Sequence, residues 1–480
     1  MPAIWRIRAF TSVRDELPPG KASIRRALRR TSRRMRRNVD GRPEGLTGFW
    51  LCSRRYAARV AFPSLRPNGL TKQREVFLDS SVADKECPAP EPFRANLGRI
   101  LFISVLFFLS FMGRFILAPL MPTIEQKFHI THSQSGSLFL MISLGFFVAQ
   151  ICSGFLSHKV THKGTLVISM LGMGLALVIF SISSQLWFIR VCLVLLGMGA
   201  GLHIPSAIAA ITAMVSNSEW GKALALHQMA PPLSLVLCPL MANLMLGFFS
   251  WQLILTIFGV VTLIVGLAFY RFGRCGEFPG DAPLPAVVKS VISTHSFWIM
   301  VVLFALAIGG SIGLYTMLPL FLVNERGMTL DWANTLLGLS RISGLFMPFV
   351  AGWFMVRIGE RIFIFGVMLV AGITTIMLGV LSGAWLIAFL FLQPAVLGCF
   401  FTAGFAALAR MVQPNLRSIA ASFATPTAFV VGGGVLPTVI GYMGQRYSFG
   451  FGIVLIGVVT ILVSGLVLFV KLVENMEAGC

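Results

Sequence analysis

Twelve apolar runs, each long enough to cross a lipid bilayer, occupy the sequence from residue 100 onward and constrain its fold more than any other feature. A spanning helix needs about 20 apolar residues, because the hydrocarbon core of a bilayer is ~30 Å thick. Hydrophobic residues make up 56% of the chain and charged residues only 12%, against about 25% charged residues in soluble domains. We therefore expect an all-α membrane protein and exclude both a soluble globular domain and a disordered chain. The expected spans cover residues 100–121, 136–157, 164–183, 186–208, 222–247, 251–270, 297–323, 332–354, 361–382, 385–408, 418–442 and 449–470.

Residues 1–95 form a basic arm of a different kind. The arm holds 21 Lys and Arg against nine Asp and Glu, so it carries +12 of the net charge of +21. Its dense run of like charge, from Ser23 to Arg37, is typical of a disordered tail. Three explanations are open: a cytoplasmic arm attracted to anionic lipid headgroups, an Arg- and Ser-rich transit peptide, or upstream sequence translated from a misassigned start. We favour the last, with the protein proper beginning nearer residue 76, because nothing in the arm shows the patterning of a fold.

The charges of the loops predict which side of the membrane each loop faces. Cytoplasmic loops carry an excess of Lys and Arg, and an even number of spans puts both termini on one side. Eleven basic residues lie in loops on the side of the termini and three in the opposite loops, so we expect both termini in the cytoplasm and the protein in a cell membrane of the bacterial inner-membrane type. The eleven are Lys159, Lys163, Lys222, Arg271, Arg274, Lys289, Arg357, Arg361, Arg410, Arg417 and Lys471, and the three are Lys127, Arg326 and Arg446.

The loop at 271–296 divides the spans into two sets of six. Its glycines and prolines are typical of a linker, and it separates an N-terminal half, 96–270, from a C-terminal half, 297–480. Gly and Pro mark fixed points in membrane helices, and the halves share such points at one offset. Parallel repeats of six spans are an architecture of secondary transporters. The pairs at a spacing of 197 or 198 residues are Pro122 with Pro319, Gly154 with Gly352, Trp187 with Trp385, Pro239 with Pro437 and Gly259 with Gly457.

A glycine followed by basic residues five and nine positions later marks the loop after the second span and again the loop after the eighth. Through this motif, the chain at about 97–475 resembles the major facilitator superfamily, in which the motif reads Gly-x-Leu-Ala-Asp-Arg-x-Gly-Arg-Arg. The aspartate is replaced here by His158 and Val356. The resemblance implies twelve helices in two halves and a gate on the cytoplasmic side; ordinary positive-inside anchoring is the alternative for the lysines. The gate residues are Gly154, Lys159 and Lys163 in the first copy and Gly352, Arg357 and Arg361 in the second.

Two arginines, Arg114 in the first span and Arg341 in the eighth, lie far from the helix ends. A charge near the bilayer centre costs at least ~2.5 kcal/mol, so it usually faces a cavity and serves function. No Asp or Glu lies inside any expected span. Two arginines on one cavity therefore predict an anion site, because the guanidinium fork fits carboxylate or phosphate oxygens. The segment from Arg114 to Pro122 also resembles organic-anion members of the superfamily; the alternative is that each arginine bonds backbone carbonyls at a helix kink.

His203 and His227 are the candidates for proton coupling, because imidazole changes charge near neutral pH and no carboxylate is available in the spans. The alternative is that each is a hydrogen-bonded packing residue. Gln150, Tyr315 and Gln393 are candidate donors to the substrate in the same pocket.

These features predict a secondary active transporter that moves a small anionic solute by proton symport or by exchange, and not an enzyme. The sequence has no G-x-x-x-x-G-K-[ST] motif and no Cys–His cluster at ligand spacing, so we expect neither a cofactor nor a metal. Because the excess charge lies in the arm, we expect no nucleic-acid partner, and we expect a monomer in the lipid bilayer. Two alternatives stay open: an efflux pump for hydrophobic or drug-like compounds, and a membrane sensor or receptor that binds a ligand without moving it.

Overall fold

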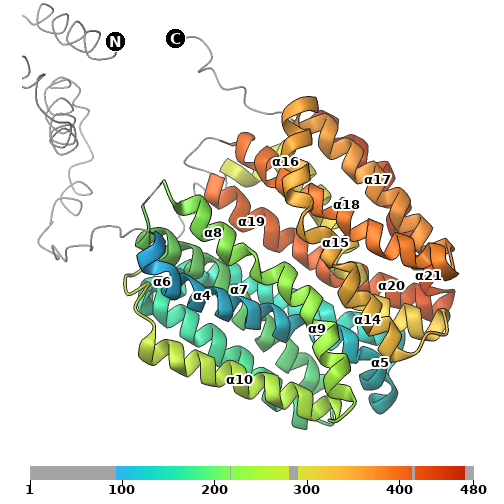
Figure 1. Cartoon of the computed structure of the whole chain (residues 1–480), viewed down its shortest axis with the longest axis horizontal. Coiled ribbons are helices and arrows are strands. Elements are labelled where there is room, and N and C mark those ends of the chain that lie inside the picture. Colours follow the sequence, from blue (N-terminus) through green and yellow to red (C-terminus); the bar gives the residue numbers. More distant parts are fainter. Residues whose placement is uncertain (1–92, 217, 281–289, 413–416, 471–480) are drawn as a thin grey trace, which may run out of the picture. The chain divides into compact units, whose positions relative to one another are not determined.

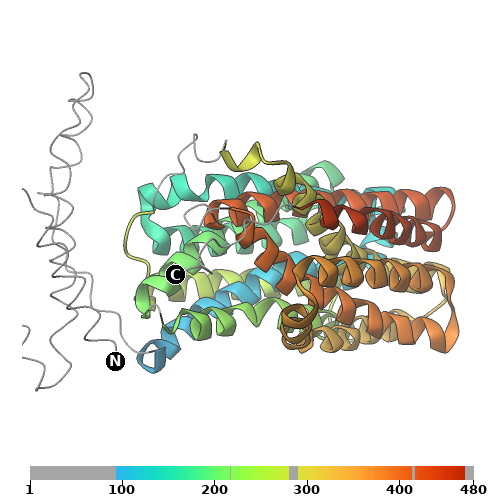
Figure 2. The same cartoon turned by 90° about the horizontal axis from the view of Figure 1, so that it is seen from above.

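The computed structural model describes residues 93–470 apart from residue 217, residues 281–289 and residues 413–416, with no side chains described at 348–349 and 417–419. The basic arm up to residue 92, together with Lys289 and Lys471, thus lies outside the described residues. Every regular element within these ranges is a helix, which confirms the expected all-α class. Ten of the described helices are long and apolar enough to cross a membrane, or eleven if one bent pair counts as a single span. The helices run roughly along one common direction in both views (Figures 1 and 2).

The N-terminal half is coloured blue to yellow-green in Figure 1. Its helices are built from long runs of Leu, Ile, Val and Phe and begin at polar caps: the Thr131 side chain accepts from the Gln134 amide, and the Ser250 side chain accepts from the Leu253 amide. Such caps satisfy amides that have no partner within the helix. The elements are α4 (Phe93–Phe115), α5 (Leu117–Phe128), α6 (His132–Ile182), α7 (Leu186–Met214), α8 (Trp220–Gln228), α9 (Ala230–Leu246) and α10 (Trp251–Phe272).

The C-terminal half differs from the first in carrying π-helical stretches at Gly309–Gly313, Phe321–Glu325 and Val430–Val435. Such stretches rearrange the backbone hydrogen bonds locally and occur often at functional sites. The elements are α12 (His295–Ile308), η2 (Gly309–Gly313), α13 (Leu314–Leu320), η3 (Phe321–Glu325), α14 (Leu330–Ser340), α15 (Ile342–Leu345), α16 (Met347–Ile358), α17 (Glu360–Val380), α18 (Gly383–Arg410), α19 (Arg417–Phe429), η5 (Val430–Val435), α20 (Leu436–Arg446), α21 (Phe449–Ser464) and η6 (Gly465–Phe469).

Helix α6 is 51 residues long, more than twice the length that a membrane requires, and it breaks at Thr161. Thr161 has φ 68° and ψ 166°, which are not helical values, so one helix ends and the next begins at this residue. A β-branched residue rarely adopts positive φ, and such a conformation costs about 1–3 kcal/mol unless its surroundings hold it. The break lies between the expected second and third spans, within the candidate gate loop.

The two halves pack tightly where α5 and the start of α6 meet α14 and α20. Asn334 donates its Nδ2 to the Pro119 carbonyl at 3.3 Å. A Cβ atom at Gly136 would overlap the Pro437 carbonyl, and one at Gly441 would overlap the His132 carbonyl. Glycine is thus required at both positions for the backbones to approach so closely.

The chain that follows α10 is bound to the break in α6. The Lys163 amide donates to the Gly276 carbonyl at 2.8 Å, the His162 amide to the Phe278 carbonyl at 3.2 Å, and the Gly280 amide to the Ser157 carbonyl at 3.1 Å. These backbone bonds satisfy groups that the interruption of the helix leaves open. Residues 274–280, which fall in the expected linker 271–296, therefore pack on the N-terminal half.

Candidate functional site

Arg114 lies at the end of α4, where a single turn residue with helical dihedral angles, Ile116, separates α4 from α5. Its side chain is 1% exposed. The Nε group donates to the Ser110 carbonyl at 3.3 Å, whereas Nη2 has no hydrogen-bond partner. A buried guanidinium with an unused donor is costly unless a ligand or water completes its hydrogen bonds.

Aromatic rings surround the Arg114 guanidinium. It lies 4.3 Å from the ring centre of Phe111, 5.0 Å from that of Phe146 and 5.9 Å from that of Phe429. Phe146 belongs to α6 and Phe429 to α19, so the arginine sits where the two halves meet. Ring faces attract a cation and exclude water, which holds the guanidinium in place without using its hydrogen-bond donors.

The two predicted coupling residues lie beside this arginine. His203 and His227 are both stacked on Phe107, with ring centres 5.1 and 4.5 Å from it, and their own ring centres are 5.9 Å apart. Phe107 in turn touches Phe111, one of the rings around Arg114. Neither nitrogen of either histidine has a hydrogen-bond partner.

Two further polar atoms near Arg114 are buried and unpartnered. One is the Ser110 hydroxyl oxygen, one turn before Arg114 on α4, and the other is Oε1 of Gln150. Gln150 lies one turn after Phe146 on α6, hence on the face that carries that ring. The structure therefore brings Arg114, His203 and His227 together, and Gln150 lies on the same face of α6 as Phe146.

Arg341, in the other half, has one hydrogen bond to a backbone carbonyl, as Arg114 does. It caps the end of α14, is 6% exposed and donates its Nη1 to the Ser311 carbonyl at 3.1 Å, while its Nε has no partner. Its guanidinium lies 4.9 Å from the ring centre of Tyr315. The Tyr315 hydroxyl donates to the Leu235 carbonyl of α9 at 3.3 Å, so this pair also lies between the halves.

Gln393 has hydrogen-bond partners within the C-terminal half. Its Nε2 donates to the Gly310 carbonyl at 2.9 Å and to the Thr375 hydroxyl at 3.3 Å. Gly310 and Ser311 both belong to the π-helical stretch η2. Gln393 and Arg341 thus donate to neighbouring carbonyls of that stretch.

A line of aromatic rings joins the two arginine regions. Phe111 contacts Phe115 at a centre-to-centre distance of 5.5 Å, and Phe115 contacts Tyr315 edge-on at 6.2 Å. Because Arg341 lies over Tyr315, a chain of ring contacts connects the two arginines.

The candidate gate residues lie around the break in α6 and its counterpart after α16; Lys159, Arg357 and Arg361 are exposed, and Lys163, Gly154 and Gly352 are half-buried. Lys163 pairs with Glu277 at 2.9 Å, and the His158 ring, in place of the family's aspartate, donates to the Gly280 carbonyl at 3.0 Å. Arg357 lies 3.7 Å from the ring centre of Trp353. Among the described residues, the exposed side chains of Lys159 and Arg361 form no ion pair. The two glycines lie one helical turn ahead: Gly154 accepts a bond from the Ser157 hydroxyl at 3.1 Å, and the Cα of Gly352 faces open space.

A sequence model of the Major Facilitator Superfamily matches residues 103–437, more than half of the chain. The chain belongs to the major facilitator superfamily. The resemblance expected from the gate motif is thereby confirmed, and the apolar helices of this superfamily member make it a multi-pass membrane protein of a transporter family.

Relatives within the superfamily match at low identity. The chain is 23% identical over 309 residues to the membrane sensor protein UhpC of Escherichia coli, which covers 58% of this chain and 67% of that protein. It is 23% identical over 159 residues to the "Probable sulfoacetate transporter SauU" of Cupriavidus necator, and this match covers 33% of this chain and 37% of that protein.

Solved structures share the superfamily fold. A bacterial homologue of the human lysosomal transporter Spinster, in an inward-facing and occupied conformation, superposes with a TM-score of 0.65 at 14% identity over 79% of this chain and 96% of that one. A mutant of the nucleoside transporter NupG superposes with a TM-score of 0.66 at 14% identity over 78% of this chain and 99% of that one. At this identity the likeness establishes the fold alone.

One ion pair at the gate loops of this superfamily member is missing from the sequence prediction. Glu360, buried at the start of α17, pairs with Arg410 at the end of α18 at 3.2 Å, and its Oε2 has no partner. The available signal was an acidic residue directly after Gly359, which has φ 82° and starts the helix. An acidic side chain is favoured in the first turn of a helix, but its partner 50 positions away is set by tertiary packing.

Proposed function

We propose that this superfamily member is a gradient-driven secondary transporter that moves a small anionic solute by alternating access. The proposal includes twelve spans in two halves, both termini in the cytoplasm, a location in the cell membrane and a monomer as the working unit. The twelve spans follow if α6 is divided at Thr161 and the bent pair α14–α16 is one span, and the basic loop residues support the orientation.

One observation carries this proposal: the unpartnered polar atoms around Arg114. The region holds an unused Nη2 donor, a serine hydroxyl oxygen, a glutamine oxygen and four imidazole nitrogens, all buried. In an apolar interior each such atom costs about 1–3 kcal/mol, so a cluster of them is expected where a ligand or ordered water completes their hydrogen bonds. A solute with an anionic group and neighbouring hydrogen-bonding groups would form hydrogen bonds with these atoms.

The charge of the site favours an anion. Arg114 and Arg341 border the region, and its described lining includes no carboxylate. A guanidinium recognises carboxylate, sulfonate or phosphate oxygens through two parallel hydrogen bonds. The relative from Cupriavidus necator, whose name assigns it a sulfonated carboxylate, supports this class of solute.

The packing between the halves supports alternating access. The halves are closed where Gly136 and Gly441 allow backbone contact, whereas at the opposite end of the helices α8 and α16 expose large apolar side chains such as Trp220 and Val356. Rocking of the two halves about a central site requires an interface at which the halves can be in contact at one end and separated at the other. The gate residues at Lys159, Lys163, Arg357 and Arg361 lie at this second end.

His203 and His227 are the proposed coupling groups. Their stacked rings are buried beside Arg114, within reach of its charge. None of the four ring nitrogens has a partner, so each neutral ring can donate one hydrogen bond to a solute and accept one proton. Protonation of either ring would add positive charge next to the anion. Coupling to protons would make the protein a symporter, and its absence would favour exchange.

A thermal-shift screen of the purified protein against carboxylates, sulfonates, phosphates, inorganic anions and cationic drugs tests the proposal. A ligand that binds the folded state raises the unfolding temperature with its occupancy. We expect one class of anion to stabilise the protein, and we expect that stabilisation to disappear in Arg114→Ala but to persist in Arg190→Ala, a control at the start of α7. Stabilisation by apolar or cationic compounds alone, equal in the wild type, Arg114→Ala and Arg190→Ala, would exclude the anion site and favour the efflux pump.

The second candidate is a membrane sensor that binds an anion without moving it. The match to UhpC over 58% of the chain favours it, as does the replacement of the gate aspartate by His158. Flux measured in proteoliposomes separates the two: a sensor would bind the stabilising anion in the screen yet give no uptake above protein-free liposomes.

A further inference from the structure

The two halves are in contact at one end of the helices, and this contact contains a titratable pair. Helices α5, α14 and α20 lie at this end, at the right in Figure 1, where Gly136 and Gly441 bring the backbones of α6 and α20 together. His132 Nδ1, at the start of α6, lies 2.7 Å from Glu125 Oε1 of α5. The His132 carbonyl is the group that a Cβ atom at Gly441 would overlap. The pair therefore borders the surface that must separate if this end is to open.

Glu125 is a buried acidic residue. Its side chain is 9% exposed, and its Oε1 also accepts from the Ser135 hydroxyl at 2.9 Å. A buried carboxylate is stabilised by hydrogen-bond donors and more strongly by a nearby positive charge. His132 supplies a donor when its ring is neutral and a charge as well when its ring is protonated. The free energy of the closed contact therefore depends on whether His132 carries the additional proton.

The His132 ring also contacts the C-terminal half. Its centre lies 4.8 Å from the ring centre of Phe449, at the start of α21, and Phe449 is buried. A cation is attracted to such a ring. His132 keeps 30% of its side chain exposed, so a charge on its ring stays partly hydrated and the cost of desolvation is small. Protonation of His132 therefore favours the closed contact.

The other charged groups at this end do not pair with Glu125. Glu325 accepts from the Gly450 amide through both carboxylate oxygens at 3.1 Å, and Arg326 donates to the Gly379 carbonyl at 2.7 Å. Among the described residues, the ion pair of Glu125 is with His132 alone. The remaining titratable side chains at this end are Lys127, His129, Asp331, Tyr442, Arg446 and Tyr447, which are exposed, and Arg190, which is half-buried.

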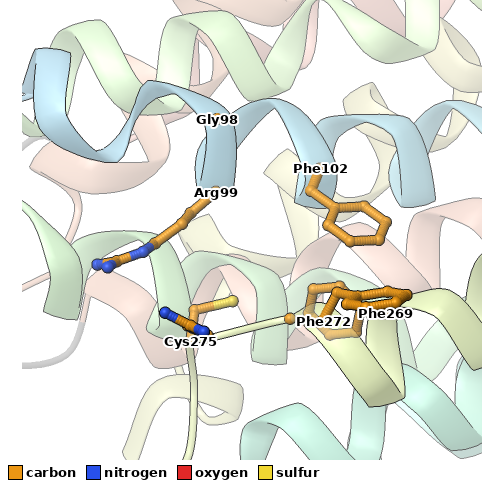
Figure 3. A pocket seen from close by; sticks show the side chains of 8 residues that line it. Gly98, Arg99, Phe102, Phe269, Phe272 and Cys275 are labelled. Atoms are coloured by element: carbon orange, nitrogen blue, oxygen red, sulfur yellow. The ribbon is translucent and has the colours of Figure 1, made fainter.

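The opposite end of the N-terminal half is packed less closely. A cavity of about 180 Å³ lies there between the start of α4 and the end of α10. In Figure 3, Phe102 on α4 faces Phe269 on α10, and Arg99 reaches toward Cys275 in the chain that follows α10. Backbones in direct contact leave no such space, so the contact at His132 is either made or broken. A change of charge there shifts the equilibrium between a closed and an open state.

We propose that His132 and Glu125 form a proton-sensing site that holds this end of the protein closed at acidic pH. Protonation of the His132 imidazole converts its hydrogen bond with Glu125 into an ion pair and places a cation against Phe449, and loss of that proton removes both interactions. This role rests on the alternating access proposed above. With the orientation proposed there, acid outside the cell favours the state that is open to the cytoplasm.

Hydrogen–deuterium exchange of the full-length protein in lipid nanodiscs at pH 5.5 and pH 8 tests this site, because imidazole changes charge in that range. Exchange times are scaled to the intrinsic rate at each pH, so that the remaining difference reports opening. We expect exchange in α20 to be about tenfold slower at pH 5.5 than at pH 8, which corresponds to ~1.4 kcal/mol. Exchange in α8, at the opposite end, should change in the reverse direction.

Substitutions separate the site from general effects of pH. His132→Asn keeps an N–H donor for Glu125 without a charge, so exchange in α20 should be equal at the two pH values. His129→Asn is the matched control, because His129 is exposed in the same loop and asparagine tolerates its φ of 50°; it should retain the tenfold difference. Glu125→Gln removes the negative charge and should reduce the difference to about threefold, the part due to Phe449.

Three outcomes would overturn the proposal: equal exchange in α20 of the wild type at both pH values, slower exchange at pH 8, or a difference that persists in His132→Asn. The variant Gly441→Ala separates such a failure from a failure of alternating access. Its added Cβ atom would overlap the His132 carbonyl, so this end should open at every pH. Faster exchange in α20 together with slower exchange in α8 would leave alternating access intact without the proton sensor, whereas an unchanged α8 would contradict both.

Discussion

Arg114 and Arg341 are buried in opposite halves of the protein, yet their surroundings differ. Around Arg114, the polar atoms of Ser110, Gln150, His203 and His227 have no partners. Around Arg341, the neighbouring polar side chains are occupied: Tyr315 donates to a carbonyl of α9, and Gln393 donates to the π-helical stretch that also accepts from Arg341. The difference therefore lies in the neighbours of the arginines, since each arginine has one unpartnered nitrogen: those of Arg114 are unbonded, as the proposed solute site requires, whereas Gln393 bonds an irregular stretch of backbone.

Replacing Arg114 should give the largest functional effect. In Arg114→Met we expect the affinity for the stabilising anion to fall about 100-fold, because a charged hydrogen bond is worth about 1.5–3 kcal/mol. The free energy of unfolding should stay the same or rise, since an incompletely bonded buried charge is removed. Ligand titration and thermal unfolding of the same variant measure both. A lower unfolding temperature with unchanged anion affinity would show that Arg114 is a structural residue and that it does not differ in role from Arg341.

Replacing Arg341 should lower the stability of the protein more than its affinity for the anion. Arg341→Gln loses the bond to Ser311 and the contact with Tyr315, so we expect the free energy of unfolding to fall by about 1–2 kcal/mol. The affinity for the anion should weaken less than fivefold, a bound of about 1 kcal/mol. If the affinity instead falls as far as in Arg114→Met, the two arginines act as equal ligands.

Gln393→Leu tests whether the second half uses its donors for the backbone. The variant loses bonds to Gly310 and Thr375, and we expect the free energy of unfolding to fall by about 1 kcal/mol with no change in anion affinity. Gln150→Leu is the matched variant in the first half, where Oε1 has no partner to lose. It should lower the affinity for the anion and leave the free energy of unfolding unchanged. Identical behaviour of the two variants would contradict the comparison.

His227→Phe should give the smallest effect, a change of a few-fold in uptake confined to part of the pH range. The phenyl ring keeps the stack on Phe107, so folding is spared, while the group that changes charge near neutral pH is removed. Uptake measured from pH 5.5 to 8 in the wild type, His227→Phe and His203→Phe would identify the coupling residue. A profile identical to the wild type in both variants would exclude proton coupling through this pair.

Much of the fold follows from the sequence, because span length and helix ends are local properties. The expected spans 186–208 and 251–270 correspond to α7 (Leu186–Met214) and α10 (Trp251–Phe272), since polar caps and loop residues interrupt the apolar runs. The expected spans 136–157 and 164–183 lie on either side of the break in α6 at Thr161. The sequence places an interruption there but does not predict its form, a positive φ at a threonine.

The candidate site was predictable in its residue types but not in its bonding. A lone arginine in an apolar run signals function wherever it lies, and the pattern therefore identified Arg114 and Arg341 alike. Which carbonyl each arginine reaches depends on distant backbone, such as the irregular stretch at Ser311. The partner of Glu360 was missed for the same reason, and the substrate roles of Tyr315 and Gln393 stay predictions.

The docking of residues 274–280 on the α6 break sets a limit on how far Ser290 can lie from that break. The chain is pinned at Gly280 and described again from Ser290, which leaves ten peptide units between the two points. A fully extended chain covers at most about 3.6 Å per residue, so these points can be no more than about 36 Å apart. The covalent connection therefore limits the distance between Gly280 and Ser290, and releasing residues 274–280 from the loop would raise that limit.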